Sequence, residues 1–429
     1  MRAKTLVAVL LALSLAGCGD RRPPTPEEKA RVTLTLWHIF NYEGPREVVA
    51  DAVARFEAAH PNVEVKVQPI ANDAYKDKLD IEMESGTPPD VFFTWGGGKL
   101  ASKVRAGLVV DLTDAMGRDG WRERFLSGPL GLCSVDGRVH AAPVDLACVP
   151  LWYNAALFKE HQLAPPETYA DLLALCRRLR DKGITPLALG NRDQWPGAFY
   201  FIYLASRTGG SQLFFDALER KPGAAFNAPA FIEAGRRVQE LVAAQAFSAG
   251  FNGIEDGRAR AQFLNGEAAM YLMGTWLVAR VKQDKADFLP DLKCVPFPRV
   301  AGGQGDPATV VGGVNCAFAV SAACAHPDEA VELLRFLTAP QVGEAWAEIG
   351  RIPAIKVGDA AMDKLPPPGK AALALLRKAK TLQPYYDQYM PDRLAEEHKK
   401  TTQGLFNGTL TPAAAADRVE EAAAKLPRP

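Results

Sequence analysis

The sequence has no excess of charge of either sign. Its 50 lysine and arginine residues balance its 50 aspartate and glutamate residues, which gives a formal net charge of +0 at pH 7. A strongly basic chain would be attracted to nucleic acid or to an anionic membrane surface, and this chain has no such overall field. We therefore expect no nucleic-acid partner and no partner that is selected by net charge.

Catalytic motifs are also missing. The chain contains neither the G-x-S-x-G motif of serine hydrolases nor the H-E-x-x-H motif of zinc proteases, and its histidines are scattered. A carboxylate pair such as Glu43 and Asp145 could still cleave a glycoside, because a sequence does not give the distance between two carboxylates. We expect a protein that is not an enzyme and that needs no cofactor, with a secreted glycoside-acting enzyme as the alternative.

Nothing in the composition indicates a disordered or fibrous protein. The 429 residues are 48% hydrophobic and 23% charged, as in ordinary globular proteins. A chain of this length can form two lobes of roughly 100 to 200 residues, each with a hydrophobic core of its own. No internal repeat is evident that would indicate a solenoid.

Long apolar runs are missing apart from one at the start. MRAK carries two positive charges, TLVAVLLALSL adds eleven apolar or small residues, and LAGC follows. The run is shorter than the roughly 20 apolar residues of a membrane-spanning helix and is typical of a signal peptide, here residues 1–17. LAGC resembles the cleavage box of bacterial lipoproteins, in which the cysteine, here Cys18, is lipidated. An ordinary secretory signal with an incidental cysteine is the alternative.

Residues 18–30 are rich in proline and charge and have nothing to bury. We expect this segment to be a flexible tether between the lipid and the folded part. Several acyl chains on one cysteine exceed the marginal anchoring of a single chain, so the protein should stay on the membrane. The expected location is therefore outside the cytoplasm, anchored by lipid to a bacterial membrane, in the periplasm or on the outer face of the cell.

Six further cysteines follow the tether. An even number permits disulfides outside the cytoplasm, but six cysteines allow fifteen sets of pairings and a large core does not need them. Cys176, inside the helical stretch DLLALCRRLRDKG, is expected to be a small core residue. Cys133 and Cys148 flank a predicted hairpin turn at Asp136 and Gly137, and they are the first pair to test.

The body of the chain alternates strand-like and helix-like segments. The pattern predicts strands at 32–37, 63–67 and 90–95, because apolar residues there alternate or run continuously. Helical spacing predicts helices over 46–60 and 74–86. Strand, helix, strand, helix, strand indicates an α/β fold with a parallel sheet covered by helices. Such sheets bind ligands at the carboxyl ends of their strands.

The stretch DVFFTWGGGKL, residues 90–100, contains the carboxyl end of the third predicted strand. Its glycine triplet before a lysine is not a phosphate-binding loop, because the residue five before Gly98 is Phe93 and Lys99 is followed by Leu100. One interpretation is that the glycines let the backbone approach a ligand while Trp95 offers a flat apolar face. The other is a tight turn beside a core tryptophan.

At this point the chain resembles a known family. LWHIFNYEGPREVVADAVARFEAAHPNVEVKV, LDIEMESGTPPDVFFTWGGGKLASKVRAGLVVDLT and DGRVHAAPVDLACVPLWYNAALF are similar, in this order, to the family 1 extracellular solute-binding proteins. The likeness continues through FLNGEAAMYLMGTW, VGGVNCAFAVSAACAHPDEAVELLRFLTAP and LFNGTLTPAAAADRVEEAA. It implies the sugar-binding subunit of a bacterial ATP-driven (ABC) importer. The implied fold is of the periplasmic-binding-protein type II, with two α/β lobes, hinge crossings and a ligand clamped between the lobes.

The resemblance also divides the mature chain. Lobe 1 would comprise residues 31–143 and 299–345, and lobe 2 would comprise residues 144–298 and 346–429. The chain would cross between the lobes near residues 142–147, 296–298 and 346–353.

A sugar site needs aromatic faces for the C–H sides of the rings. Trp95 falls where relatives that bind maltodextrins place a stacking tryptophan, and Trp276 in LMGTW matches a second such position on the other lobe. Core packing is the alternative for both. Trp195 is a further candidate, although a loop tryptophan often caps a core. Tyr385 and Tyr386 resemble the aromatic contribution of the C-terminal part of the family.

A sugar site also needs polar groups for the hydroxyls. Asn41 and Glu43 follow the first strand and would bind hydroxyls, with helix capping as the alternative. Asp145, at the first crossing, resembles a ligand carboxylate, although the family's acidic residue could lie one or two places away. The remaining candidates for ligand contact are Gly96, Gly97, Asn315, Arg351 and Asp387.

A metal-ion carrier on the same fold is a further alternative, with Tyr385 and Tyr386 as iron ligands. A hard cation prefers several oxygen ligands, however, and the tryptophans at the expected cleft would have no role there. The expectation is therefore a monomer with no bound metal. It would bind an oligosaccharide or another sugar and deliver it to the permease subunits of an ABC transporter.

Overall fold

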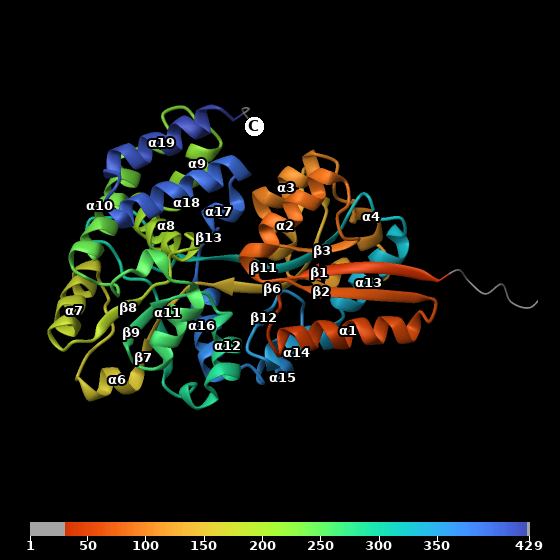
Figure 1. Ribbon diagram of the computed structural model, residues 1–429, viewed down its shortest axis with the longest axis horizontal. Coiled ribbons are helices and arrows are strands. Elements are labelled where there is room, and N and C mark those ends of the chain that lie inside the picture. Colours follow the sequence, from red (N-terminus) through yellow and green to blue (C-terminus); the bar gives the residue numbers. More distant parts are fainter. Residues whose placement is uncertain (1–30, 427–429) are drawn as a thin grey trace, which may run out of the picture.

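The N-terminal part of the structure, a computed structural model that describes residues 31–426, alternates strands and helices (Figure 1). Three strands, β1 (Val32–His38), β2 (Val63–Pro69) and β3 (Val91–Thr94), are joined by α1 (Pro45–Ala59) and α2 (Asn72–Ser85). β1 pairs in parallel with both β2 and β3. The expected parallel α/β arrangement is confirmed. The expectations for the signal peptide, the tether and Cys18 lie outside the described residues.

Local sequence explains these elements. β1 buries every second residue, which places its hydrophobic side chains on one face of the sheet. α1 begins with proline at its first position, where the missing N–H is tolerated, and buries Val49 and Phe56 at helical spacing. α2 ends at Gly86, which adopts the left-handed conformation (φ 79°) that favours glycine.

The larger sheet combines distant parts of the chain. Its order is β12-β6-β11-β3-β1-β2, with β13 paired to β11. β11 (Val310–Val320) is antiparallel to both β3 and β6 (Ala142–Cys148), so the late strand β11 lies between two early ones. The short strands are β12 (Ile352–Pro353) and β13 (Leu382–Gln383).

A four-stranded sheet forms the centre of the other half, in the order β10-β7-β9-β8. Helices surround this sheet on the left of Figure 1. Its strands are β7 (Leu151–Asn154), β8 (Thr185–Ala188), β9 (Ala268–Leu272) and β10 (Leu292–Val295). The remaining elements are α3 (Gly97–Arg105), α4 (Thr113–Met116), α5 (Ser127–Leu132), β4 (Ser134–Val135), β5 (Arg138–Val139), α6 (Ala155–Glu160), α7 (Tyr169–Asp181), α8 (Trp195–Gly209), α9 (Gln212–Leu218), α10 (Pro229–Ala243), α11 (Asp256–Leu264), α12 (Leu277–Asp284), α13 (Pro327–Leu337), α14 (Pro340–Glu348), α15 (Asp359–Met362), α16 (Pro367–Lys378), α17 (Tyr386–Tyr389), α18 (Asp392–Asn407) and α19 (Pro412–Ala424).

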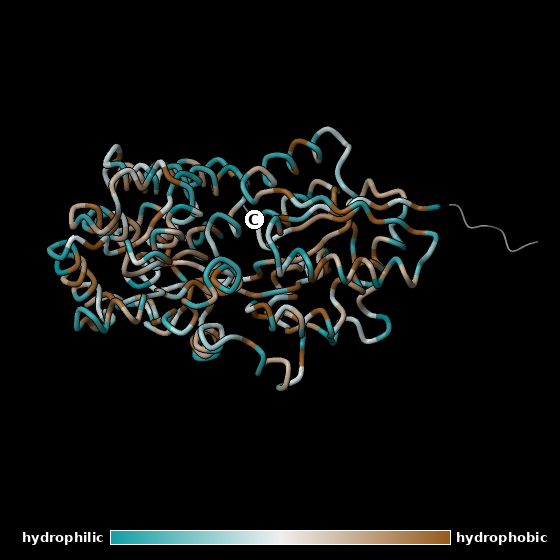
Figure 2. The backbone as a smooth tube through the Cα atoms, turned by 60° about the horizontal axis from the view of Figure 1, so that its bottom comes forward, coloured by the Kyte–Doolittle hydropathy of each residue, from teal (hydrophilic) through white to brown (hydrophobic). Residues whose placement is uncertain are grey.

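Buried hydrophobic residues form two separate cores, which we call the lobe 1 core, around the larger sheet, and the lobe 2 core. Figure 2 shows hydrophobic segments inside both halves. β11 contributes to both cores, because Val310 and Val311 belong to lobe 2 and Val314 belongs to lobe 1. The chain goes back to lobe 1 after the expected residue 299, and it goes back to lobe 2 after the expected residue 346. Val300 still packs in the lobe 2 core, whereas Ile355 packs in the lobe 1 core.

Cys133 and Cys148, the first pair to test for a disulfide, are not joined in this structure. Both thiols are free and buried, Cys133 in the lobe 1 core and Cys148 in the lobe 2 core. The hairpin between them is confirmed, since β4 and β5 pair and both turn residues, Asp136 and Gly137, have positive φ. Cys176 is buried in α7, as expected.

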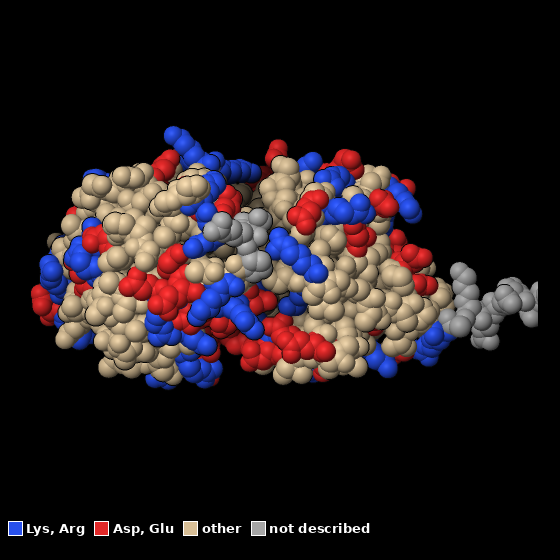
Figure 3. Space-filling model, turned by 90° about the horizontal axis from the view of Figure 1, so that it is seen from above, with Lys and Arg blue, Asp and Glu red and all other residues tan. Residues whose placement is uncertain are grey.

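Charged side chains of both signs are distributed over the two halves of the surface in Figure 3, in keeping with the zero net charge. Between residues 31 and 426, no helix has the length and apolar character to cross a membrane.

Candidate ligand-binding site

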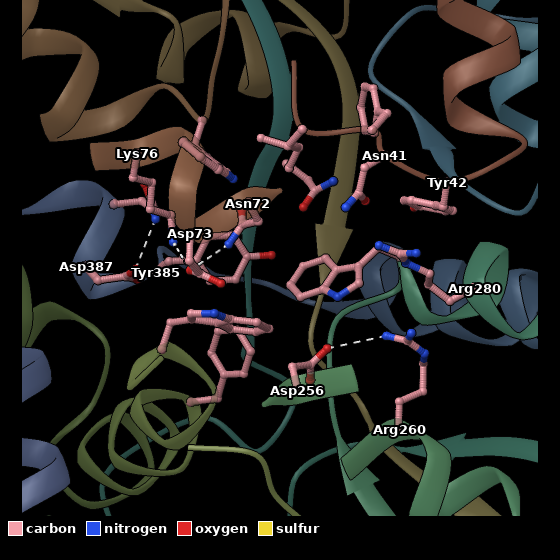
Figure 4. Close-up of a pocket in the computed structure, with 18 of the residues that line it drawn as sticks. Asn41, Tyr42, Asn72, Asp73, Lys76, Asp256, Arg260, Arg280, Tyr385 and Asp387 are labelled. Carbon is pink, nitrogen blue, oxygen red and sulfur yellow. Dashed lines mark hydrogen bonds and ion pairs between the residues drawn. The ribbon is translucent and has the colours of Figure 1, made fainter. Parts of the chain in front are cut away.

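A cavity of about 210 Å³ lies between the two cores and collects side chains from both (Figure 4). Lobe 1 contributes the loop after β1, the start of α2 and the residue after β3. Lobe 2 contributes the start of α8, α11 and α12, and the segment before α18. The lining residues are Ile39, Phe40, Asn41, Tyr42, Asn72, Asp73, Lys76, Trp95, Trp195, Phe199, Asp256, Arg260, Trp276, Arg280, Asn315, Arg351, Tyr385, Asp387 and Gln388.

An aromatic cluster forms the lobe 2 side of the cavity. The ring centroids of Trp195 and Trp276 are 6.1 Å apart, and those of Phe199 and Tyr385 are 5.8 Å apart. Trp276 also lies 6.5 Å from Tyr385. Both tryptophans are only partly buried, so part of each indole remains open to the cavity. This side offers the apolar faces that the C–H side of a sugar ring requires.

Trp276 owes its position to a glycine. A Cβ atom on Gly274 would overlap the indole of Trp276, so the ring can fold back over the backbone only because residue 274 has no side chain. Trp276 then immediately precedes α12. The motif LMGTW thus fixes the aromatic group at the entrance of a helix that faces the cavity.

Trp95 supplies the aromatic face on the lobe 1 side. It packs edge to face on Phe93, with ring centroids 4.7 Å apart and an interplanar angle of 81°. Lys76 Nζ lies 5.5 Å from the centroid of the indole, which is within the range of a cation–π contact. Trp95 is partly buried, unlike the fully buried Trp121, Trp152 and Trp346. It is therefore a lining residue that rests on the core.

A buried ion pair lies under the cavity at the crossing between the lobes. Asp145 and Arg351 are 1% and 3% exposed, and Arg351 Nε is 2.6 Å from Asp145 Oδ2. The Asn315 amide donates to both oxygens of the same carboxylate, at 3.3 and 3.2 Å. Arg351 Nη1 donates to the hydroxyl of Tyr42 at 3.2 Å. The carboxylate of Asp145 is thus engaged by protein groups and is not a lining residue.

The charged lining residues gather at the two ends of the cavity, as Figure 4 shows. At one end, Lys76 Nζ donates to Asp73 at 3.2 Å and Asp387 accepts from the Gln388 amide at 3.0 Å. The other end carries arginines of α11 and α12, described next.

Arg260 forms an ion pair with Asp256 at 3.6 Å. The hydroxyl of Tyr271 also donates to Asp256. Burial raises the pKa of the Asp256 carboxyl, against the opposing effects of the Tyr271 hydroxyl and Arg260. Arg280 lies over the ring of Tyr42, with its guanidinium carbon 3.3 Å from the ring centroid.

Eight of the expected site residues line this cavity and five do not. The eight are Asn41, Trp95, Trp195, Trp276, Asn315, Arg351, Tyr385 and Asp387. The five are Glu43, Gly96, Gly97, Asp145 and Tyr386. Glu43 is exposed outside the cavity, and neither Asn41 nor Glu43 caps α1, which has no side-chain cap. Tyr386 stacks on Phe214 inside lobe 2, with ring centroids 3.9 Å apart.

The glycine triplet was expected to let the backbone approach a ligand, but in the structure it allows close contact with other parts of the protein backbone. A Cβ on Gly96, which has φ 73°, would lie 2.7 Å from the carbonyl oxygen of Leu132, and one on Gly97 would lie 3.0 Å from that of Gln388. A Cβ on Gly98 would overlap the carbonyl of Tyr389. Gly97 and Gly98 therefore let α3 of lobe 1 lie against the backbone of α17, whereas Gly96 lies against the end of α5. The close approach is to protein and not to a ligand in the cavity.

Sequence reasoning missed several lining residues. Asn72, Asp73 and Lys76 begin α2 directly after β2, so the rule that ligands bind at the carboxyl ends of parallel strands would have found them. Tyr42 lies in the same loop as Asn41. Asp256, Arg260, Arg280, Phe199 and Gln388 come from helices or turns of lobe 2 and carry no motif, so no sequence signal pointed to them.

A second hollow of about 750 Å³ lies between α3, the β4–β5 hairpin and the C-terminal helices. It contains none of the tryptophans. The smaller cavity is the better candidate, because aromatic faces and polar groups from both lobes converge there. Within residues 31–426, no group of three His, Cys, Asp or Glu side chains is placed to hold a metal ion.

Comparison with known proteins gives a consistent result. The sequence model of the family described as bacterial extracellular solute-binding protein matches residues 43–344. An uncharacterised ABC transporter extracellular-binding protein of Pyrococcus horikoshii is 26% identical over 387 residues, which cover 87% of this chain and 84% of that protein. The melibiose/raffinose/stachyose-binding protein of Bacillus subtilis is 24% identical over 347 residues, which cover 80% of this chain and 78% of that protein.

Solved structures agree with these relatives. A structure from work on xylan utilisation by Caldanaerobius polysaccharolyticus matches with a TM-score of 0.87 at 32% identity, over 91% of this chain and 99% of that one. A chitin oligosaccharide binding protein matches with a TM-score of 0.82 at 23% identity, over 91% of this chain and 98% of that one. The second likeness concerns the fold alone.

Proposed function

This chain belongs to the bacterial extracellular solute-binding protein family, and from this we propose that it captures an oligosaccharide outside the cytoplasm and delivers it to an ABC transporter permease. Relatives with this fold include proteins named for binding raffinose and stachyose. The members of the family are binding proteins, so the role proposed here is recognition without turnover.

One observation carries the proposal. Trp95 of lobe 1 and the aromatic cluster of lobe 2 line the same cavity, together with amides, carboxylates and guanidinium groups. Aromatic planes fit the C–H faces of sugar rings, and charged polar groups form strong hydrogen bonds with their hydroxyls. A purely apolar ligand would leave these polar groups unpaired, at a cost in free energy.

The position of the cavity supports a clamp. A ligand that contacts Trp95 and Trp276 together is satisfied only when both lobes enclose it, so binding stabilises the closed arrangement. The crossing strands β6 and β11 are the natural hinge, since each has residues in both cores. In this proposal the protein acts as a monomer, and lipidation of Cys18 keeps it at the membrane beside the permease.

A ligand screen tests this function. Unfolding of the purified protein is followed by thermal shift with neutral and acidic oligosaccharides of several linkages. Ligand at a hundred times its dissociation constant stabilises the fold by about 2.7 kcal/mol, which raises the unfolding temperature measurably. Small-angle scattering should show a smaller radius of gyration with the best ligand. Failure of every sugar to shift unfolding would contradict the proposal.

A control separates binding in the cavity from binding elsewhere. The double variant Trp95→Ala/Trp276→Ala removes an aromatic face from each side of the cavity, and it should lose the thermal shift while still unfolding cooperatively. A shift that persists in this variant would mean that the sugar binds outside the proposed site.

A further inference from the structure

The arginine end of the cavity differs from the other end in how its charges are paired. At the end near α2, the carboxylate of Asp73 accepts from Lys76 and that of Asp387 accepts from the Gln388 amide. Asp256, on the floor in Figure 4, is engaged by Arg260 and by Tyr271. Each lining carboxylate therefore has a donor within the protein.

The guanidinium of Arg280 has no such partner. Among the described residues it forms no ion pair within 4.0 Å, and none of its N–H groups donates a hydrogen bond to a protein acceptor. Burial lowers the pKa of Arg280, and Tyr42 opposes this most strongly, followed by the carboxylates of Asp284 and Asp256, neither of which lies within 4.0 Å of the guanidinium. A positive charge placed in a cavity in this way is suited to a negative partner from outside the chain.

The geometry of Arg280 favours a planar anion. Its guanidinium carbon lies 3.3 Å from the centroid of the Tyr42 ring, so its face is occupied by the tyrosine. Stacking leaves the N–H groups on the edge, which match the two oxygens of a carboxylate. Tyr42 is itself held in place, because it is 8% exposed and its hydroxyl accepts from Arg351 Nη1.

A second, independent observation lies beside the same tyrosine. Arg351 is 3% exposed and lines the cavity, and its Nη2 atom has no hydrogen-bond partner although it is buried. Its Nε and Nη1 atoms are used by Asp145 and Tyr42. Buried donors are almost always paired, so an unpaired one that lines a ligand cavity indicates an acceptor that the protein does not supply.

We propose that the natural ligand is an acidic oligosaccharide, whose uronic acid carboxylate binds the edge of Arg280 beside Tyr42 and Arg351. This inference rests on the proposed function and names its ligand class. The paired carboxylates at the α2 end bind hydroxyls of the neutral part of the oligosaccharide. The distribution of charge in the cavity therefore orients the ligand along it. Neutral sugars bind the same aromatic faces more weakly.

Three probes of one backbone test the proposal by calorimetry. These three probes are xylotriose, xylotriose with one glucuronic acid branch, and the methyl ester of that branched sugar. A second set, on another backbone, consists of trigalacturonate and its methyl ester. For at least one set we expect the acid to bind ten or more times tighter than its ester. The ester keeps the size of the ligand and removes only its charge, so this ratio isolates the carboxylate.

Variants then assign the preference to a residue. Arg280→Gln should reduce the acid-to-ester ratio to about one, while Arg280→Lys should keep part of it because the charge remains. Arg258→Gln is the control. Arg258 is exposed on α11, the helix that also carries Arg260, but Arg258 does not line the cavity, so its loss should leave the acid-to-ester ratio unchanged. Equal affinity for acid and ester, or an equal loss for both in Arg280→Gln, overturns the proposal.

The outcome also separates this proposal from the function on which it rests. If neutral oligosaccharides bind and acids bind no better, the acidic ligand class is wrong and sugar binding stands. If a sulfated sugar is preferred over the carboxylate, the anion site stands and the uronic acid assignment is overturned. If no sugar of either kind binds, both proposals fail.

Discussion

Arg351 and Asp145 face each other under the cavity, with Nε 2.6 Å from Oδ2, although residue 145 belongs to the first crossing of the chain and residue 351 to a later one. Both side chains are almost fully buried. Removal of one partner leaves the other charge buried and uncompensated, which costs about 3 to 5 kcal/mol.

The ion pair gives the first prediction. Asp145→Asn and Arg351→Met should each lower the free energy of unfolding by about 3 to 5 kcal/mol, and the double variant should lose much less than the sum. Urea unfolding of the four proteins measures the coupling. Additive losses would show that the two residues stabilise the crossing independently of each other.

The tryptophans of the cavity give the second prediction. A sugar face that covers roughly 100 Å² of indole contributes about 2.5 kcal/mol, so Trp95→Ala should weaken sugar binding by very roughly 50-fold to 100-fold. Its unfolding without ligand should change little. Trp152→Ala is the matched control, since Trp152 is fully buried in lobe 2 and its truncation should cost about 3 to 5 kcal/mol of stability. A large stability loss in Trp95→Ala with unchanged affinity would make Trp95 structural.

The glycine contact gives the third prediction. The Cβ of Gly98→Ala would overlap the carbonyl of Tyr389, so α3 and α17 must move apart, at a cost of about 1 to 3 kcal/mol. Gly128→Ala adds the same methyl group on α5, where nothing lies within 4 Å, and serves as the control. Thermal unfolding compares the two. Equal stability of both variants would mean that the close approach of the two helices is dispensable.

The sequence predicted the local elements well because their signals are local. The periodicity of 32–37 and 46–60 reflects which face of a strand or helix is buried, and the structure has β1 and α1 there. The turn at Asp136 and Gly137 followed from residues that tolerate positive φ. These features depend on neighbouring residues alone.

The site was only partly predictable because it depends on three-dimensional proximity. Nothing near Asp145 in the sequence shows that Arg351 would occupy its carboxylate, which turned an expected ligand contact into an internal ion pair. Gly97 and Gly98 approach α17, nearly 300 residues later, and no local pattern reveals this. Arg280 is an ordinary helical arginine until the fold places it over Tyr42.

Two buried histidines give the fourth prediction. Burial lowers the pKa of His38 and of His398 to about 4, from about 6.5 in the unfolded chain. Because only the unfolded state gains protons between these values, their contribution to stability is complete above about pH 6.5 and is lost as the pH falls to about 4. Each histidine should account for about 3 kcal/mol of this loss.

Urea unfolding between pH 7 and pH 4 measures the effect. His398→Gln should show a shallower decline of stability with acidification than the natural chain, because one of the two protonation sites of the unfolded state is gone. An unchanged slope would show that His398 does not titrate differently in the two states.

Cys18 gives the fifth prediction. If LAGC directs lipidation, Cys18→Ser should release the protein from the membrane fraction and leave sugar affinity unchanged, since the tether precedes the folded part. Fractionation of the native host and mass measurement of the N-terminus check this. A natural chain that is soluble and carries no acyl group would contradict the anchor.

The position of β11 also has a consequence for the order in which the protein folds as it is synthesised. The strand lies between β6 and β3, so the larger sheet lacks its middle until residue 320 has left the ribosome. An N-terminal fragment of some 150 residues holds β1, β2, β3 and β6 but cannot join β6 to the others. The sheet of lobe 1 is therefore completed only after all four strands of the lobe 2 sheet have been synthesised, although lobe 1 holds the first strands of the chain.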